Sequence, residues 1–136
     1  MNNSDLILLI DKLRALPKEN EWVEFKTGTA TTNEKLGQYI SAISNAACIA
    51  HQPFGYLIFG IENDTHQVKG TSYKFKNTKE GNEELELWIR RLLHPSIRFQ
   101  HFTLDYNNLY LEVFQIPAAK AQPTHFKKIP YIRFNS

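Results

Sequence analysis

Apolar residues recur at helical spacing in three parts of the chain. The spacing predicts helices over residues 5–16, about 31–51 and 83–93. Ser4 would cap the first helix, and Thr31 with Glu34 would form a capping box at the start of the second. A proline follows each helix closely and would end it.

The remaining apolar segments have the patterns of strands. A short strand is predicted over residues 22–27, and the unbroken apolar run 54–61 indicates a central strand buried on both faces. Residues 97–104 and 109–116 alternate and predict a hairpin, and residues 131–134 predict a final short strand. Polar residues 72–81 predict an exposed loop. The fold class is therefore α+β: a mostly antiparallel sheet with about three helices packed on it.

The size and composition fit one domain with its own core. At 136 residues and 42% hydrophobic content, the chain is an ordinary globular sequence. We divide it into an N-terminal helix, residues 1–18, and a main domain, residues 19–136. No apolar run is long enough for a membrane span, no secretory signal is visible, and Cys48 has no cysteine to pair with. These features indicate a cytoplasmic protein with no membrane partner.

Charge is distributed unevenly along the chain. Residues 1–64 carry five Lys and Arg against eight Asp and Glu, whereas residues 65–136 carry eleven against six. A basic half favours a polyanionic partner such as nucleic acid, and ordinary surface charge explains the asymmetry equally well.

The acidic half contains one pattern that suggests metal chemistry. Glu24 and Lys26 are two apart on a predicted strand, so their side chains share a face, and Glu19 precedes that strand. Glu62 follows the end of the central strand, where functional groups often cluster, and Asp64 is explained by turn chemistry. Carboxylates beside a lysine suit a divalent cation acting on a phosphodiester. The alternative for Glu24 and Lys26 is a solvated strand face.

The basic half supplies candidate phosphate contacts. Aromatic residues lie among them, as base-stacking sites require: Tyr73, Phe75, Phe126, Tyr131 and Phe134. Solubilising lysines are an equal alternative for the loop. The candidate nucleic-acid-binding residues are Lys74, Lys76, Lys79, Arg90, Arg91, Lys127, Lys128 and Arg133.

Several motifs together resemble the Schlafen AlbA_2 family. They are the segment Glu19 to Lys26, Ile43-Ser44-Asn45-Ala46 in the second helix, the strand ending Gly60-Ile61-Glu62, Gln122-Pro123-Thr124, and Tyr131 to Ser136. The resemblance spans residues 19–136. It implies a DNA-binding domain, usually at the head of longer bacterial transcriptional regulators or helicase-like proteins.

A related animal domain cleaves tRNA and rRNA with three acids and a divalent metal. The resemblance places these acids at Glu19, Glu24 and Glu62, with Asp64 as the alternative to Glu62. This sequence departs from the pattern in having one glycine, Gly55, where the family has a pair, and Glu62 where the nucleases have Asp.

Three hypotheses follow. The first is a nucleic-acid-binding module of a bacterial transcriptional regulator, held mainly by backbone electrostatics. The second is a Mg²⁺- or Mn²⁺-dependent endoribonuclease acting on structured RNA, in which Glu19, Glu24 and Glu62 hold the cation and Lys26 orients the phosphate. The third is an interaction domain without nucleic acid. Because the chain ends inside the closing motif, we expect a further C-terminal domain, and a homo-oligomer is left open.

Overall fold

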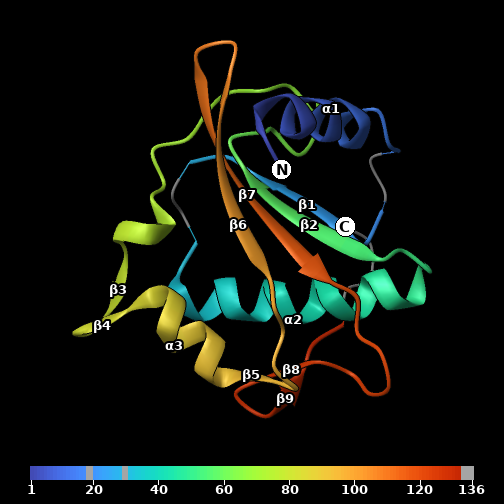
Figure 1. The fold of residues 1–136 in the computed structure, drawn as a ribbon, viewed down its shortest axis with the longest axis vertical. Helices are drawn as coiled ribbons and strands as arrows, with labels where there is room; N and C mark the ends of the chain where they lie inside the picture. The colour runs from blue at the N-terminus through green and yellow to red at the C-terminus, as the bar shows by residue number, and fades with distance from the viewer. Residues whose placement is uncertain (18–19, 29–30, 133–136) are drawn as a thin grey trace.

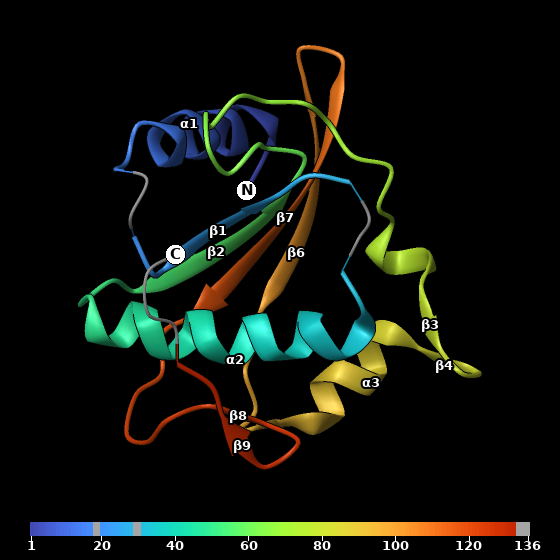
Figure 2. The same ribbon diagram turned by 180° about the vertical axis from the view of Figure 1, so that it is seen from behind.

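A four-stranded sheet lies between two helices in the computed structural model, which describes residues 1–17, 20–28 and 31–132. Helix α1 covers one face of the sheet and α2 runs across the other (Figures 1 and 2). The smaller elements α3, β3, β4, β5, β8 and β9 lie on the α2 side, away from the β6–β7 turn. The expected α+β class, with three helices on a mostly antiparallel sheet, is confirmed among these residues.

The elements follow one another along the chain with these bounds: α1 Asn3–Arg14, β1 Val23–Lys26, α2 Asn33–Ile49, β2 Phe54–Phe59, the 3-10 helix η1 Phe75–Asn77, β3 Lys79–Glu80, β4 Glu83–Glu84, α3 Leu85–Leu92, β5 Leu93–His94, β6 Gln100–Tyr106, β7 Leu109–Pro117, β8 His125–Phe126 and β9 Ile129–Pro130. None of the described helices is long and apolar enough to cross a bilayer.

The main sheet has the order β1-β2-β7-β6. Strands β1 and β2 are parallel, with Glu24 opposite Leu57 and Lys26 opposite Phe59. The β2–β7 and β6–β7 pairs are antiparallel, and β6 and β7 form the predicted hairpin. Strands β5, β8 and β9 form a separate small antiparallel sheet.

Two apolar cores lie on opposite faces of the main sheet. On the α1 face, Val23 and Phe25 of β1 pack with Ile10 of α1. On the α2 face, Leu57 of β2 packs with Ile40 of α2 and with residues of α3. Because side chains alternate along a strand, β2 is buried on both faces, as its unbroken apolar run predicted.

The helix caps differ from the predicted ones by one or two positions. Asn2 caps α1, and its side chain accepts a hydrogen bond from the Asp5 amide while the Asp5 carboxylate accepts one from the Asn2 amide. Thr32 caps α2 and accepts from the Lys35 amide. The predictions of Ser4 and Thr31 as caps were therefore wrong, because Ser4 lies inside α1 and Thr31 lies one residue before the cap position of α2.

Residues 72–81 are not the exposed loop that their composition predicted. Phe75 in η1 is fully buried, and Tyr73 stacks on Phe59 with 4.4 Å between ring centroids. Lys74, Lys76 and Lys79 of the same segment are exposed, so its rings point inward and its charges outward. In the closing segment, Tyr131 and Ile132 lie outside any strand, contrary to prediction, and the rest of the predicted strand lies outside the described residues.

Candidate nucleic-acid interface

Glu24 and Lys26 share one face of β1, as predicted from their spacing. Lys26 Nζ lies 3.7 Å from Glu24 Oε2 and 4.6 Å from the ring centroid of Tyr39 in α2. Glu24 is only 8% exposed, because α2 covers this face of the strand. The pair is a fixed contact between β1 and α2 rather than a solvated strand face.

Glu62 lies in a turn that is fastened to the α1 side of the sheet. The Glu62 carbonyl accepts a hydrogen bond from the His66 amide, and His66 lies edge-on to Phe25, 4.8 Å away. Arg14 Nε donates to the His66 carbonyl at 2.7 Å, and His66 Nδ1 lies 2.9 Å from the Arg14 carbonyl. The turn carrying Glu62 is thus held toward α1, while Glu24 lies on the α2 face.

The predicted three-acid metal site depends on a residue outside the described ranges. Glu19 lies in the stretch 18–19 that the structure does not describe. Among the described residues, no three His, Cys, Asp or Glu side chains come together in a way that could hold a metal ion. Glu24 and Glu62 alone do not make such a site, so the predicted set of three ligands requires Glu19.

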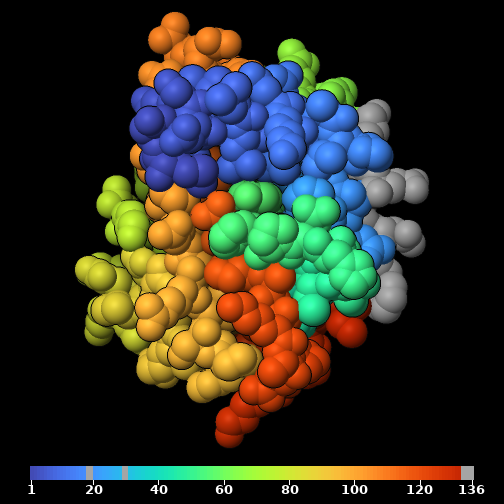
Figure 3. Space-filling model, turned by 45° about the vertical axis from the view of Figure 1, so that its right-hand side comes forward, coloured from blue at the N-terminus to red at the C-terminus, as the bar shows by residue number. Residues whose placement is uncertain are grey.

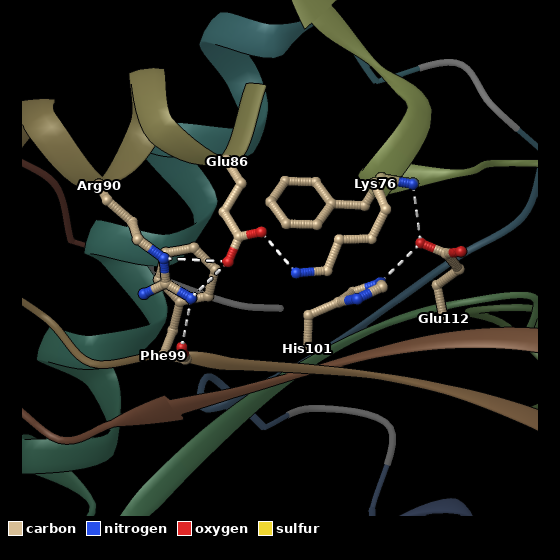
Figure 4. Close-up of polar contacts among 7 residues, drawn as sticks. Lys76, Glu86, Arg90, Phe99, His101 and Glu112 are labelled. Carbon is tan, nitrogen blue, oxygen red and sulfur yellow. Dashed lines mark hydrogen bonds and ion pairs between the residues drawn. The ribbon is translucent and has the colours of Figure 1, made fainter. Parts of the chain in front are cut away.

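Most of the predicted phosphate-binding residues lie around α3, and several are paired with acids. Glu86 receives hydrogen bonds from Lys76 and Arg90, and Arg90 also donates to the Phe99 carbonyl at 2.9 Å (Figure 4). Burial acts most strongly on Glu86 and raises its pKa, but the two cations outweigh it and leave the pKa below the ordinary value. The Glu86 carboxylate therefore neutralises much of the positive charge that Lys76 and Arg90 would otherwise offer to a phosphate.

Further members of that set are engaged in the same way. Arg91 pairs with Glu83 at 2.8 Å, and Lys127 pairs with Glu34 at 2.7 Å. Lys74 Nζ lies 3.3 Å from the ring centroid of Tyr110. In the part of the chain that the structure describes, Lys79 and Lys128 form no ion pair, and Arg133 lies outside that part.

The aromatic residues expected to stack on bases are largely core residues. Tyr73, Phe75 and Phe126 are 7%, 0% and 0% exposed. Gly37 of α2 lets Phe126 approach closely, since a Cβ there would lie 2.2 Å from the ring. Tyr131 is half-buried, and Phe134 is outside the described ranges. Tyr73, Phe75 and Phe126 therefore anchor the elements that carry the basic residues and do not offer a stacking surface.

A second group of cations, of which only Lys128 was singled out from the sequence, is free of neighbouring acids along the chain. Residues 87–104 and 113–136 contain no Asp or Glu. The pairing of β5 with β8 brings these two segments together. They expose three cations that form no ion pair with any described residue: Arg98, Lys120 and Lys128. The absence of Asp and Glu from these two segments was the sequence signal that could have identified these cations.

Two adjoining hollows lie on this surface. The larger is a cavity of about 500 Å³ between residues 95–98 and 117–124, with Arg98 and Lys120 in its lining. The smaller, of about 320 Å³, is lined by His94, His125 and Lys128. His94 and His125 face each other across the β5–β8 pair. We call Arg98, Lys120, Lys128, His94 and His125 the basic surface.

Three polar residues of α2 fix one wall of the larger cavity. Asn45 accepts a hydrogen bond from the Thr124 amide and donates to the Thr124 and Tyr131 carbonyls, at 2.7, 3.0 and 2.8 Å. Ser44 donates to the Pro117 carbonyl at 2.8 Å, and Ser41 donates to the Thr124 carbonyl at 2.8 Å. These buried contacts join the Ile43-to-Ala46 motif to the Gln122-to-Thr124 and Tyr131 motifs. They hold segment 117–124 at both ends.

A buried acid lies in β7 of the main sheet. Glu112 of β7, 1% exposed, accepts a hydrogen bond from His101 Nε2 at 2.8 Å (Figure 4). It also accepts hydrogen bonds from the Phe75 amide at 3.0 Å and from the Tyr110 hydroxyl. Burial is the strongest influence and raises the Glu112 pKa, yet these donors together bring it below the ordinary value. Burial of Tyr73 itself, followed by the nearby Glu112 charge, raises the pKa of the Tyr73 hydroxyl.

The sequence model of the family described as Schlafen, AlbA_2 matches residues 19–136, most of the chain. The chain belongs to the Schlafen AlbA_2 family. The resemblance inferred from the motifs is thereby confirmed. The hydrogen bonds of Asn45 to Thr124 and Tyr131 join in space three of the motifs that carried the resemblance.

A solved structure shares this fold. The N-terminal domain of a RecG-related protein from Nitrosomonas europaea is 19% identical, with a TM-score of 0.54, covering 100% of this chain and 91% of that one. The DIP2311 protein from Corynebacterium diphtheriae is 17% identical with a TM-score of 0.49, covering 91% of this AlbA_2 chain and 24% of its own. A comparison with curated proteins found no match.

Proposed function

We propose that this AlbA_2 domain binds the phosphate backbone of nucleic acid through the basic surface, as the DNA-binding part of a bacterial transcriptional regulator. The observation that carries the proposal is the juxtaposition of two acid-free segments, which exposes Arg98, Lys120 and Lys128 around two hollows. Cations without internal partners are available to replace the counterions of a phosphate backbone.

The family and a fold neighbour support this proposal. The chain matches the AlbA_2 family, the resemblance from which a DNA-binding domain was expected, and the Nitrosomonas europaea protein has a name that relates it to ATP-dependent DNA helicases. The chain also separates its charges in space: acids of residues 83–86 neutralise the cations of α3, while the β5–β8 end keeps its positive charge. Such an arrangement concentrates a positive field at one end of the molecule.

The test is a salt titration of binding. Wild-type protein and the triple variant Arg98→Ala/Lys120→Ala/Lys128→Ala are titrated with a fluorescent 20-base-pair DNA by anisotropy between 50 and 200 mM salt. The loss of up to three phosphate contacts reduces the slope of log affinity against log salt by about 2 to 3. EDTA leaves binding unchanged, since no metal is needed for this contact.

A matched control separates this surface from net charge. The variant Lys12→Ala/Lys35→Ala/Lys69→Ala removes three exposed lysines from other elements and changes net charge equally. It retains more of the wild-type affinity and slope than the first variant. Equal losses in both triple variants would show general charge attraction, and no binding by wild type at 50 mM salt would overturn the proposal.

A second candidate function is a Mg²⁺- or Mn²⁺-dependent endoribonuclease. Glu24 and Lys26 on one face of β1 favour it, since they place a carboxylate beside a cation that suits a phosphate oxygen. A divalent ion bound there would supply a Lewis acid for phosphodiester cleavage. Against this, Glu24 is largely covered by α2, and the turn carrying Glu62 is fastened on the α1 side.

A further inference from the structure

We propose that the cavity between residues 95–98 and 117–124 takes one unstacked base of a single strand, with Arg98 and Lys120 holding the neighbouring phosphates. This inference rests on the proposed function and names the form of nucleic acid that the basic surface prefers. It predicts that the domain binds single strands, or unpaired stretches, more tightly than a regular duplex of the same sequence.

The size and lining of the cavity carry the first step. Its volume of about 500 Å³ falls in the range of pockets that hold small organic ligands. Its apolar lining comes from Pro95, Ile97, Pro117 and small alanines of segment 118–121. A base in a duplex is stacked and paired, so it cannot enter an apolar cavity of this kind. A base turned out of the stack needs such apolar contacts on its faces.

The polar groups at the cavity carry the second step. Gln122 is exposed in the lining and offers an amide donor and acceptor that can pair with a base edge. Arg98 and Lys120 come from the two opposite walls, and both are exposed. Phosphates on either side of an inserted base would therefore meet a cation on each wall, which is the arrangement expected for a single-strand groove.

The rigidity of the wall carries the third step. Ser44, Asn45 and Ser41 bind segment 117–124 at its start and its end, and their side chains are buried. The Ala119 amide also donates to the Ser44 carbonyl at 3.0 Å. A loop already fixed in place loses little conformational entropy on binding. Figure 3 shows residues 117–130, in orange to red, between the end of α2 in green and the yellow to orange surface before β6.

The experiment compares single and double strands on the same protein. A fluorescent 12-nucleotide oligo-dT, the matching oligo-U and a 12-base-pair duplex are titrated by anisotropy at 50 mM salt. The variant Ser96→Leu fills the cavity without changing charge, and Ser72→Leu is the matched substitution at an exposed serine outside it. Ser96→Leu weakens single-strand binding by about tenfold, the worth of one base contact, and duplex binding by less than twofold.

A second reading follows the base itself. A 2-aminopurine within the single strand brightens when it leaves its stacked neighbours, so its fluorescence rises on binding to wild type and to Ser72→Leu but not to Ser96→Leu. Ala121→Leu, at another exposed position of the lining, repeats the test if Ser96→Leu does not fold. A common loss with dT and U strands indicates a base site that accepts both DNA and RNA.

The two proposals fail in different ways. Equal binding of single strand and duplex, unaffected by Ser96→Leu and Ala121→Leu, overturns the base cavity while backbone binding stands. Absence of binding to all three nucleic acids overturns the proposed function and the base cavity together. Loss of duplex and single-strand binding in equal measure on filling the cavity also overturns the inference, because the site would then be a backbone contact.

Discussion

His101 Nε2 donates a hydrogen bond to the buried carboxylate of Glu112 across the β6–β7 pair, at 2.8 Å. Both side chains are almost fully covered, at 3% and 1% exposure. The same Glu112 oxygen also accepts a hydrogen bond from the Phe75 amide, 37 positions earlier in the chain. This second bond attaches the η1 segment to the β6–β7 hairpin. The buried acid therefore joins two parts of the molecule that share no strand pairing.

Glu112→Ala destabilises the domain, because it leaves the His101 nitrogen, the Tyr110 hydroxyl and the Phe75 amide without their acceptor. Each buried group that loses its partner costs on the order of 1–3 kcal/mol of unfolding free energy. Urea unfolding followed by tryptophan fluorescence measures the loss. Glu84→Ala, at an exposed glutamate of β4, is the control and changes stability by less than about 0.5 kcal/mol. If Glu112→Ala lowered the unfolding free energy no more than Glu84→Ala, the hydrogen bonds around Glu112 would not stabilise the domain as argued.

Acid weakens the wild-type domain partly through Glu112. Its pKa in the folded state lies below the ordinary value of 4.5, so the stabilisation is present above that pH and is lost as pH falls through the folded-state pKa. Unfolding free energy therefore falls more steeply below pH 4.5 in wild type than in Glu112→Gln, which has no carboxyl to protonate there. Urea unfolding at pH 7, 5, 4 and 3 compares the two, and parallel curves would argue against the lowered pKa.

Gly37→Ala destabilises the domain, although alanine favours a helix over glycine by about 1 kcal/mol. Its Cβ would lie 2.2 Å from the Phe126 ring, so β8 must shift away from α2. Overpacking of this kind costs about 1–3 kcal/mol. Phe126→Leu removes the ring atoms in question, so the double variant loses less than the sum of the two single changes. Additive losses in thermal unfolding would show that the contact is not tight.

The strand and helix patterns predicted most of the fold. The residues 54–61 identified the central strand and the alternation in 97–116 identified the hairpin, because both signals are local. The η1 segment was missed because its contacts are distant in sequence: the Phe75 ring packs on Phe114, and the Phe75 amide donates to Glu112, 37 positions away. In the same way, Lys76 looked available in the sequence, and only the fold brings it onto Glu86, which Arg90 reaches from one helical turn away within α3. Arg98 and Lys120 became candidates only when β5 and β8 paired.

Glu86→Gln raises the affinity for nucleic acid. It releases Lys76 and Arg90 from their shared carboxylate and adds one positive charge on the α3 side. One additional phosphate contact on duplex DNA steepens the plot of log affinity against log salt by about 1 unit of slope. Asp105→Asn, beside the β6–β7 turn and away from α3, makes the same change in net charge. A steeper slope in both variants would assign the effect to net charge and not to the released cations.

Glu24→Gln distinguishes the binding module from the nuclease. If the domain only binds backbone, tRNA incubated with wild-type protein and Mn²⁺ stays intact on a denaturing gel, and Glu24→Gln binds duplex DNA as tightly as wild type. The Glu24–Lys26 contact is internal, so its loss affects packing against Tyr39 and leaves the basic surface unchanged.

The opposite result would establish the metal-dependent activity. In that case tRNA is cleaved only with Mn²⁺, cleavage stops with EDTA, and it disappears in Glu24→Gln, a variant shown by circular dichroism to be folded. Glu62→Gln then decides whether the turn on the α1 side contributes a ligand, since cleavage that survives this change leaves the metal to Glu19 and Glu24.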